Sequence, residues 1–131
     1  ENTIVIEREL MKDLRVIHLN DSGMRGEPSK MGFSTGRFID DILIVETTNF
    51  IADKWGSHTG VDSSAEKHLI EKFNLSDDGL YLHSEITIID PVYLDEPITF
   101  NHRWIKLADR DVIQAPCTME AAQLYLDAGY E

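Results

Sequence analysis

Residues 36–50 read GRFIDDILIVETTNF, and this stretch decides how the sheet is built. Two strand-forming runs flank Asp40 and Asp41, and aspartate tolerates the left-handed backbone that a two-residue hairpin turn needs. With the turn at these two residues, Ile39 pairs with Ile42, and every later pair along the hairpin follows from that register. The stretch therefore predicts an antiparallel hairpin with a defined pairing.

The two faces of this hairpin differ in charge. Side chains alternate along a strand, so the predicted register sorts them into two sets. The uncharged set, which we assign to the protein interior, contains Ser34, Gly36, Phe38, Leu43, Val45 and Thr47. The other face carries Arg37 and Glu46 as diagonal neighbours, which predicts an ion pair on the outer surface. Glu46 is therefore expected to point away from the interior, whereas Thr47 points inward and is satisfied by a neighbouring group.

A second hairpin is predicted to turn at Asp78-Gly79, which is a stronger turn signal. Counting outward from this turn places Glu71 on a face that is otherwise apolar apart from Ser84. An unpaired buried charge costs several kcal/mol, so Glu71 is expected to have a cationic or donor partner or to keep its proton. The alternation leaves two interpretations open, a structural ion pair or a ligand site around a buried carboxylate.

Partners for Glu71 are expected on other strands. In residues 98–106, alternation places His102 and Trp104 on the inward face, where the indole needs an acceptor or a ligand to stack on. In residues 14–19, either Arg15 with Ile17 or the alternate residues face inward, and periodicity does not decide between them. Arg15, Glu71, His102 and Trp104 are the candidate ligand-binding residues.

Strand signals dominate the chain and predict an all-β fold. We expect eight strands, at Thr3–Glu7, Leu14–Leu19, Met31–Phe38, Ile42–Thr47, Glu66–Leu75, Leu80–Ile89, Ile98–Lys106 and Val112–Pro116. One short C-terminal helix is expected, with Thr118 as its N-cap and Gly129 at its end. This order predicts an eight-stranded up-and-down antiparallel barrel of the lipocalin or streptavidin kind, with a sandwich of two four-stranded sheets as the alternative. The loop at 49–65, which contains Trp55, is predicted to be a packed surface loop rather than a lid.

Composition limits the function classes. The 131 residues fit one domain, 1–131, and the net charge of −12 argues against nucleic-acid binding. No apolar run approaches the ~20 residues of a membrane-spanning helix, and no spacing of His or Cys predicts a metal site. We expect no cofactor. Cys117 is the single cysteine, which excludes an internal disulfide. The start at Glu1 fits either a trimmed chain or a mature protein after signal cleavage.

Four segments together resemble a large group of exported bacterial proteins of unknown function. MGFSTGRFIDDILIVETTNF (31–50) is similar to that group's signature "lGhSvGrWeGDtLvVdTtgF". RVIHLN (15–20) resembles "RrIylDG", SAEKHLIEKF (64–73) resembles "SealhvvErF", and TIIDP (87–91) resembles "TveDP". The resemblance covers most of residues 14–91, and Arg15 and Glu71 both occupy matching positions. It implies a lipocalin- or streptavidin-like barrel and export to the periplasm, and it implies no established activity.

The chain also departs from that group's pattern. Phe33 stands where the group has His, Phe38 where it has Trp, and Asp40 where it has the turn Gly. After Cys117, the acidic, Asn-containing tail of the group is replaced by the helix-like TMEAAQLYLDAG. Roles that depend on the replaced groups are not carried over to this chain.

Our leading hypothesis is a non-enzymatic module that binds a small, partly apolar ligand inside the barrel. Glu71 would orient the polar end of the ligand, with Arg15 or His102 as its partner and Trp104 as a stacking surface. One alternative is an enzyme that uses Glu71 and His102 as an acid/base pair. Another is a structural or interaction protein with a solid barrel, which self-associates through an outer apolar face formed by Ile39, Ile42, Ile44 and Ile70.

Overall fold

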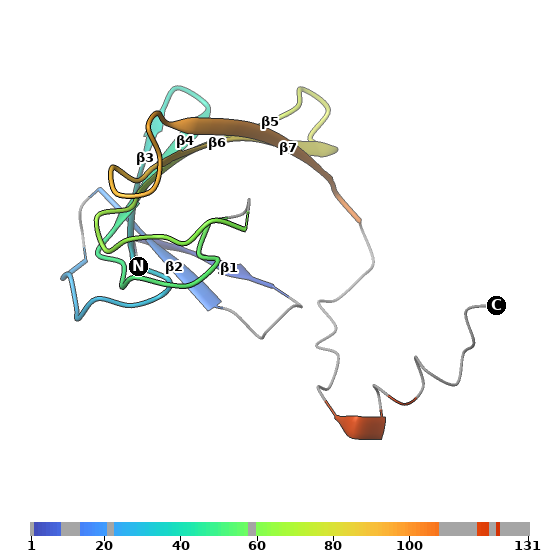
Figure 1. Ribbon diagram of the computed structural model, residues 1–131. Coiled ribbons are helices and arrows are strands. Elements are labelled where there is room, and N and C mark those ends of the chain that lie inside the picture. Colours follow the sequence, from blue (N-terminus) through green and yellow to red (C-terminus); the bar gives the residue numbers. More distant parts are fainter. Residues whose placement is uncertain are drawn as a thin grey trace.

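The structure is a computed structural model that describes residues 2–8, 14–20, 23–57, 60–107, 118–120 and 123. Seven strands form a single sheet in the order β1-β2-β3-β4-β5-β6-β7. Their bounds are β1 Thr3–Glu7, β2 Leu14–Leu19, β3 Phe33–Ile39, β4 Ile42–Thr48, β5 His68–Leu75, β6 Tyr81–Ile89 and β7 Ile98–Ile105. The sheet curls into a half-barrel, in which β3 to β7 arch over β1 and β2 (Figure 1).

The prediction of an all-β, barrel-like fold is confirmed. All seven strands belong to one sheet, so the described part of the chain is not the alternative sandwich of two sheets. The eighth predicted strand, Val112–Pro116, and Cys117 lie outside the described residues. The predicted C-terminal helix also lies outside them, apart from residues 118–120 and 123.

The up-and-down prediction is wrong at one point, because β2 and β3 pair in parallel. The segment between these strands leaves one end of the sheet after Leu19 and re-enters it at the other end, at Phe33, instead of turning back at once. Gly36 allows the close approach of the two strands, since an added Cβ there would lie 2.8 Å from a side-chain carbon of Ile17. All other neighbouring strands pair antiparallel.

Both predicted hairpin registers are confirmed. Ile39 pairs with Ile42, and Leu75 pairs with Leu82. Asp40 adopts a positive φ of 51° and Gly79 one of 67°, which is the left-handed backbone that each turn requires. The turn chemistry of the sequence therefore set the pairing of β3 with β4 and of β5 with β6.

One face of the sheet forms the concave side of the half-barrel, and its residues follow from the registers. From β2 to β7 these residues include Arg15, Ile17, Ser34, Gly36, Val45, Thr47, Glu71, Phe73, Ser84, Ile86, Ile88, Phe100 and His102. Ile17 and Val45 are fully buried there, and Ile88 is almost so. Six polar side chains lie among these apolar ones and define the candidate site: Arg15, Ser34, Thr47, Glu71, Ser84 and His102.

Candidate functional site

Glu71 is a buried carboxylate on β5, as the alternation predicted, and only 4% of its surface is exposed. It pairs across the sheet with Val45 on one side and Ile86 on the other. Its cationic partner is Arg15 on β2, which is 5% exposed. Arg15 with Ile17 therefore faces the interior, which decides between the two alternatives that periodicity left open.

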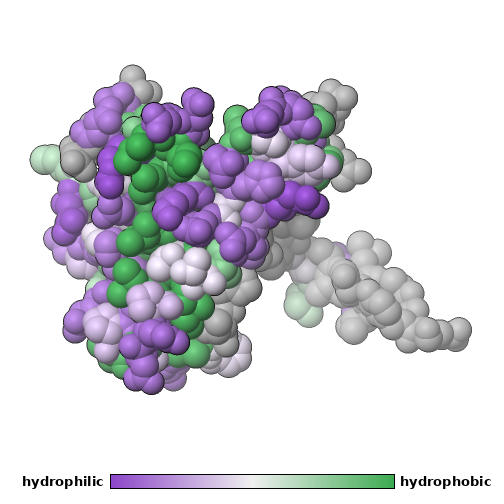
Figure 2. Space-filling view, turned by 90° about the horizontal axis from the view of Figure 1, so that it is seen from above, coloured by the Kyte–Doolittle hydropathy of each residue, from purple (hydrophilic) through white to green (hydrophobic). Residues whose placement is uncertain are grey.

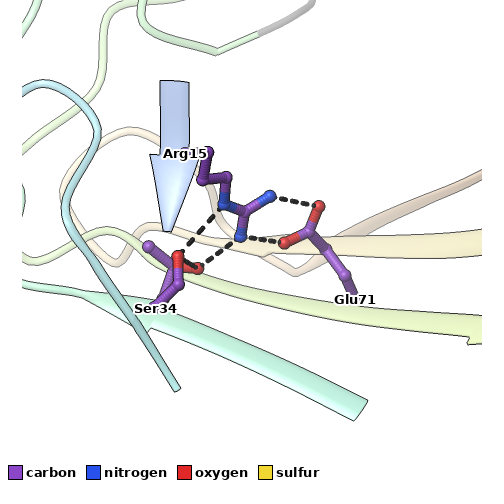
Figure 3. A network of polar contacts seen from close by, with 4 residues as sticks. Arg15, Ser34 and Glu71 are labelled. Carbon is purple, nitrogen blue, oxygen red and sulfur yellow. Dashed lines mark hydrogen bonds and ion pairs between the residues drawn. The ribbon is translucent and has the colours of Figure 1, made fainter. Parts of the chain in front are cut away.

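The ion pair is bidentate. Arg15 Nη1 donates to Glu71 Oε1 at 2.9 Å, and Nη2 donates to Oε2, so the planar guanidinium and the carboxylate lie side by side (Figure 3). Such fork-to-fork pairs are stronger and more directional than a single charged hydrogen bond. Both oxygens of Glu71 are therefore engaged by one partner.

Two hydroxyl groups complete the network. Arg15 Nε donates to Ser34 Oγ at 3.1 Å, and Nη2 also donates to Thr47 Oγ1 at 2.7 Å. The two hydroxyl oxygens lie 2.9 Å apart and share a hydrogen bond. Ser34 and Thr47 are 2% and 1% exposed, so the four polar side chains are buried and hydrogen-bonded to one another. The prediction that Thr47 points inward and is satisfied by a neighbour is confirmed.

This network ties four strands together. Arg15 lies on β2, Ser34 on β3, Thr47 on β4 and Glu71 on β5. Because its charges cancel and both carboxylate oxygens accept bonds from Arg15, Glu71 is not placed to act as a general base. The four side chains therefore form a closed polar network on the concave face.

Ser84, on β6, differs from these four residues. It is 3% exposed, and its Oγ has no hydrogen-bond partner among the described residues. On the concave face it lies between Phe73 of β5 and His102 of β7, its two register partners. A buried hydroxyl without a partner forfeits roughly 1–3 kcal/mol, which a bound group could recover. The sequence signal for Ser84 was its position as a polar residue on an apolar face.

His102 and Trp104 lie on the concave face by register, as predicted. The His102 ring lies 5.3 Å from that of Phe100, edge to face, and 5.7 Å from that of Trp104. Trp104 pairs with Leu82 near the end of β7 and is 47% exposed, so it borders the concave face instead of being enclosed by it. Phe100, His102 and Trp104 thus form a row of contacting rings along β7.

The structure brings Glu71 together with Arg15 and places His102 elsewhere. Glu71 is on β5 and His102 on β7, with β6 between them. Two strand spacings of about 4.8 Å separate their backbones. The register partner of His102 is Ser84, not Glu71. Of the four predicted site residues, two form the network and two belong to the row of rings.

The outer face carries the exposed Arg37–Glu46 ion pair that the register predicted, and further ion pairs beside it. Arg37 Nη1 lies 3.0 Å from Glu46 Oε1, and Lys72 Nζ lies 2.6 Å from Glu85 Oε1. His68 Nε2 is 3.5 Å from the other oxygen of Glu46. Glu46 therefore points to the outside, as the register predicted.

A second buried carboxylate, Asp90, holds a turn that follows β6. Its oxygens accept hydrogen bonds from the backbone N–H of Ser64 at 2.7 Å, the hydroxyl of Ser64 at 2.8 Å and the backbone N–H of Val92 at 3.1 Å. Burial favours the neutral acid, but these donors outweigh it and keep the pKa of Asp90 below its ordinary value of 3.8. The sequence pattern gave no signal for this role of Asp90.

The 49–65 loop is packed, as predicted, over the part that the structure describes. Asp53 and Ser63 form an antiparallel bridge across it. Lys67 Nζ donates to the carbonyl of Gly56 at 3.0 Å and to Ser63 Oγ at 3.2 Å, and it lies 4.3 Å from the ring centre of Phe50. Burial lowers the pKa of Lys67. These contacts hold the loop on the body of the protein.

Within the described residues, no group of three or more His, Cys, Asp or Glu side chains could hold a metal ion. No helix in that part of the chain is long and apolar enough to cross a membrane. Comparison with known proteins gives no match to any protein-family model, curated protein or solved structure.

Proposed function

We propose that this protein is a binding module that holds a small, largely apolar molecule with a neutral polar group against the concave face of its sheet. The observation that carries the proposal is the buried Ser84 hydroxyl, which lacks a partner among the described residues and lies on an apolar surface. Ligand sites commonly combine apolar walls with a few placed polar groups, and this surface fits that pattern.

The apolar part of the ligand would lie along the aromatic residues. Phe73 flanks Ser84 on one side, and Phe100, His102 and Trp104 form the row of rings on the other. All four rings belong to the same concave face by register. The half-exposed indole of Trp104 would give the ligand a stacking surface at the edge of the site.

The polar part of the ligand is expected to be neutral. Arg15 and Glu71 cancel each other's charge, and their contacts with Ser34 and Thr47 leave the network closed. A charged ligand group would have to leave water without gaining an opposite charge on this face, which is costly. Ser84 can both donate and accept, so a hydroxyl or carbonyl group suits it. Ser84, rather than Glu71, would then orient the polar end.

The eighth strand at 112–116 belongs to the same proposal. Each of the outermost strands, β1 and β7, has one neighbour in the described sheet. An additional strand between them would close the half-barrel and enclose the concave face, as in small barrels that hold one ligand. Export to the periplasm, which the resemblance implies, remains a prediction.

A binding experiment with matched probes tests the proposal. Isothermal titration calorimetry would compare 1-decanol, decanoate and decylammonium, which share a chain and differ in head-group charge. We expect the alcohol to bind best and the Ser84→Ala variant to bind it about two- to tenfold more weakly, the cost of one hydrogen bond. Asn101→Ala, on the outer face of β7, serves as the control and should bind normally.

Two outcomes would overturn the proposal. One is that none of the three probes binds. The other is that Ser84→Ala and the control bind the alcohol with equal affinity. Because Ser84 Oγ has no partner among the described residues, its removal should not destabilise the free protein, so a binding loss would not reflect unfolding.

A further inference from the structure

A diagonal stripe of isoleucines crosses the outer, convex face of the sheet. Ile39 pairs with Ile42 at the β3–β4 turn, and Ile44 lies two residues further along β4. Ile70 on β5 and Ile89 on β6 continue the line, each diagonal to the last by register, and Ile44, Ile70 and Ile89 are partly exposed. Ile39 and Ile42 are 48% and 41% exposed. Figure 2, which looks onto this side, shows apolar surface running in a band between polar side chains.

The stripe is bordered by charges that cancel. Arg37, Glu46 and His68 lie along one side of it, and the ion pair of Lys72 with Glu85 lies along the other. The two cations and two carboxylates of these borders sum to zero, whereas the whole chain carries −12. The two long sides of the isoleucine stripe are thus neutral on a strongly acidic protein, and Asp40 and Asp41 add negative charge only at the end of the stripe.

We infer that the isoleucine stripe is the contact face of a homodimer, in which two copies pack their stripes together across a two-fold axis. Contiguous exposed apolar surface with a polar border is typical of protein interfaces. An anionic membrane or a basic protein would be attracted by net charge along the stripe, which its two ion-paired borders lack. A second copy of the chain brings both cations and carboxylates, so it can pair with both kinds of charged side chain at the borders of the stripe.

Symmetry makes the charged borders self-complementary. With the two stripes antiparallel, residue i of one copy faces residue j of the other, and the reverse contact also forms. Arg37 of each copy then faces Glu46 of the other. The same arrangement separates the acidic β3–β4 turns, where Asp40 and Asp41 stand at one end of the stripe. Like charges at the turns therefore do not oppose this orientation.

The inference predicts an unusual salt dependence. Two chains of −12 repel each other, and added salt screens that repulsion while leaving apolar burial intact. Sedimentation equilibrium at about 20 mM and about 500 mM NaCl should therefore show more dimer at the higher salt concentration. Binding driven by charge would show the opposite trend.

Variants locate the contact. Ile42→Glu should weaken dimerisation roughly tenfold or more, because it places a carboxylate in an apolar contact. Val5→Glu adds the same charge at another exposed strand position, 57% exposed on β1, and should leave the dimer intact. Arg37→Glu should weaken the dimer, and adding Glu46→Arg should restore it. Circular dichroism would confirm that each variant is folded, and if Ile42→Glu does not fold, the charge-swap pair locates the contact.

A monomer at both salt concentrations would overturn the inference. So would a dimer that Ile42→Glu leaves unchanged, or one that Val5→Glu disrupts equally. None of these results depends on ligand binding at the concave face, so this inference and the proposed function fail or stand separately.

Discussion

Glu71 and Glu46 occupy neighbouring strands and opposite faces of the same sheet. Glu71 lies opposite Val45, one position from Glu46, yet it is buried in a closed network with Arg15. Glu46 pairs with Arg37 in water, with more than a third of its side chain exposed. The chemistry of the two ion pairs is the same, and their surroundings make the energetic consequences of losing a partner very different.

The largest expected effect comes from breaking the buried pair. Glu71→Gln leaves the Arg15 guanidinium buried without its counter-charge, and we expect unfolding in urea to show a loss of about 3–5 kcal/mol. The double variant Arg15→Met with Glu71→Leu removes both charges and should recover most of that loss. A loss below about 1 kcal/mol in the single variant would mean that the pair behaves like a surface pair.

Asp90 shows that a buried carboxylate in this protein does not require a cationic partner. It is as buried as Glu71, but its hydrogen-bond donors are the backbone and hydroxyl of Ser64 and the backbone of Val92. Asp90→Asn replaces one acceptor oxygen with a donor, and we expect a loss of about 1–3 kcal/mol at pH 7.

The effect of Asp90 should also depend on pH. Its pKa is lower in the folded protein than in the unfolded chain, so its stabilising contribution is present above about pH 4 and is lost as the pH falls through the folded pKa. Urea unfolding of the wild type and Asp90→Asn between pH 7 and pH 2.5 should show the two stabilities converge at low pH. A constant difference across this range would contradict the assignment.

The smallest effect is expected on the outer face. Arg37→Ala removes the partner of Glu46 in water, and the free energy of unfolding should fall by no more than about 1 kcal/mol, less at high salt. When Arg37→Ala and Glu71→Gln are measured under the same conditions, the ratio of their losses in unfolding free energy compares an exposed ion pair with a buried one. Equal losses would remove the distinction between the two faces.

Much of this contrast could be predicted from the sequence, because turn chemistry and alternation are local. Asp40-Asp41 and Asp78-Gly79 fixed two registers, and these placed Glu46 outside and Glu71 inside. The four strands β3 to β6 contain both hairpins, so local signals were sufficient there.

Features that depend on distant parts of the chain could not be predicted in the same way. The sequence held no information on how the chain passes from Leu19 to Phe33, so the parallel pairing of β2 with β3 was not predicted. Periodicity could not choose between Arg15 and its alternate neighbours, because the choice is made by Glu71, 56 positions away. The half-exposure of Trp104 follows from its position near the end of β7, which alternation does not report.

The parallel β2–β3 pairing has a consequence for the order of folding. Its register covers only three residue pairs, from Ile17 with Ser34 to Leu19 with Gly36. It places Arg15 against Glu71, 56 positions along the chain, whereas the β3–β4 and β5–β6 hairpins join residues close in sequence. Contacts with a high loop-closure cost form late, so the β1–β2 ribbon should dock onto an already formed meander. The Arg15–Glu71 ion pair would then be absent from the folding transition state. It would stabilise the protein by slowing unfolding and would leave the folding rate unchanged. Stopped-flow kinetics of Glu71→Gln would read this directly, as a faster unfolding rate at an unchanged folding rate.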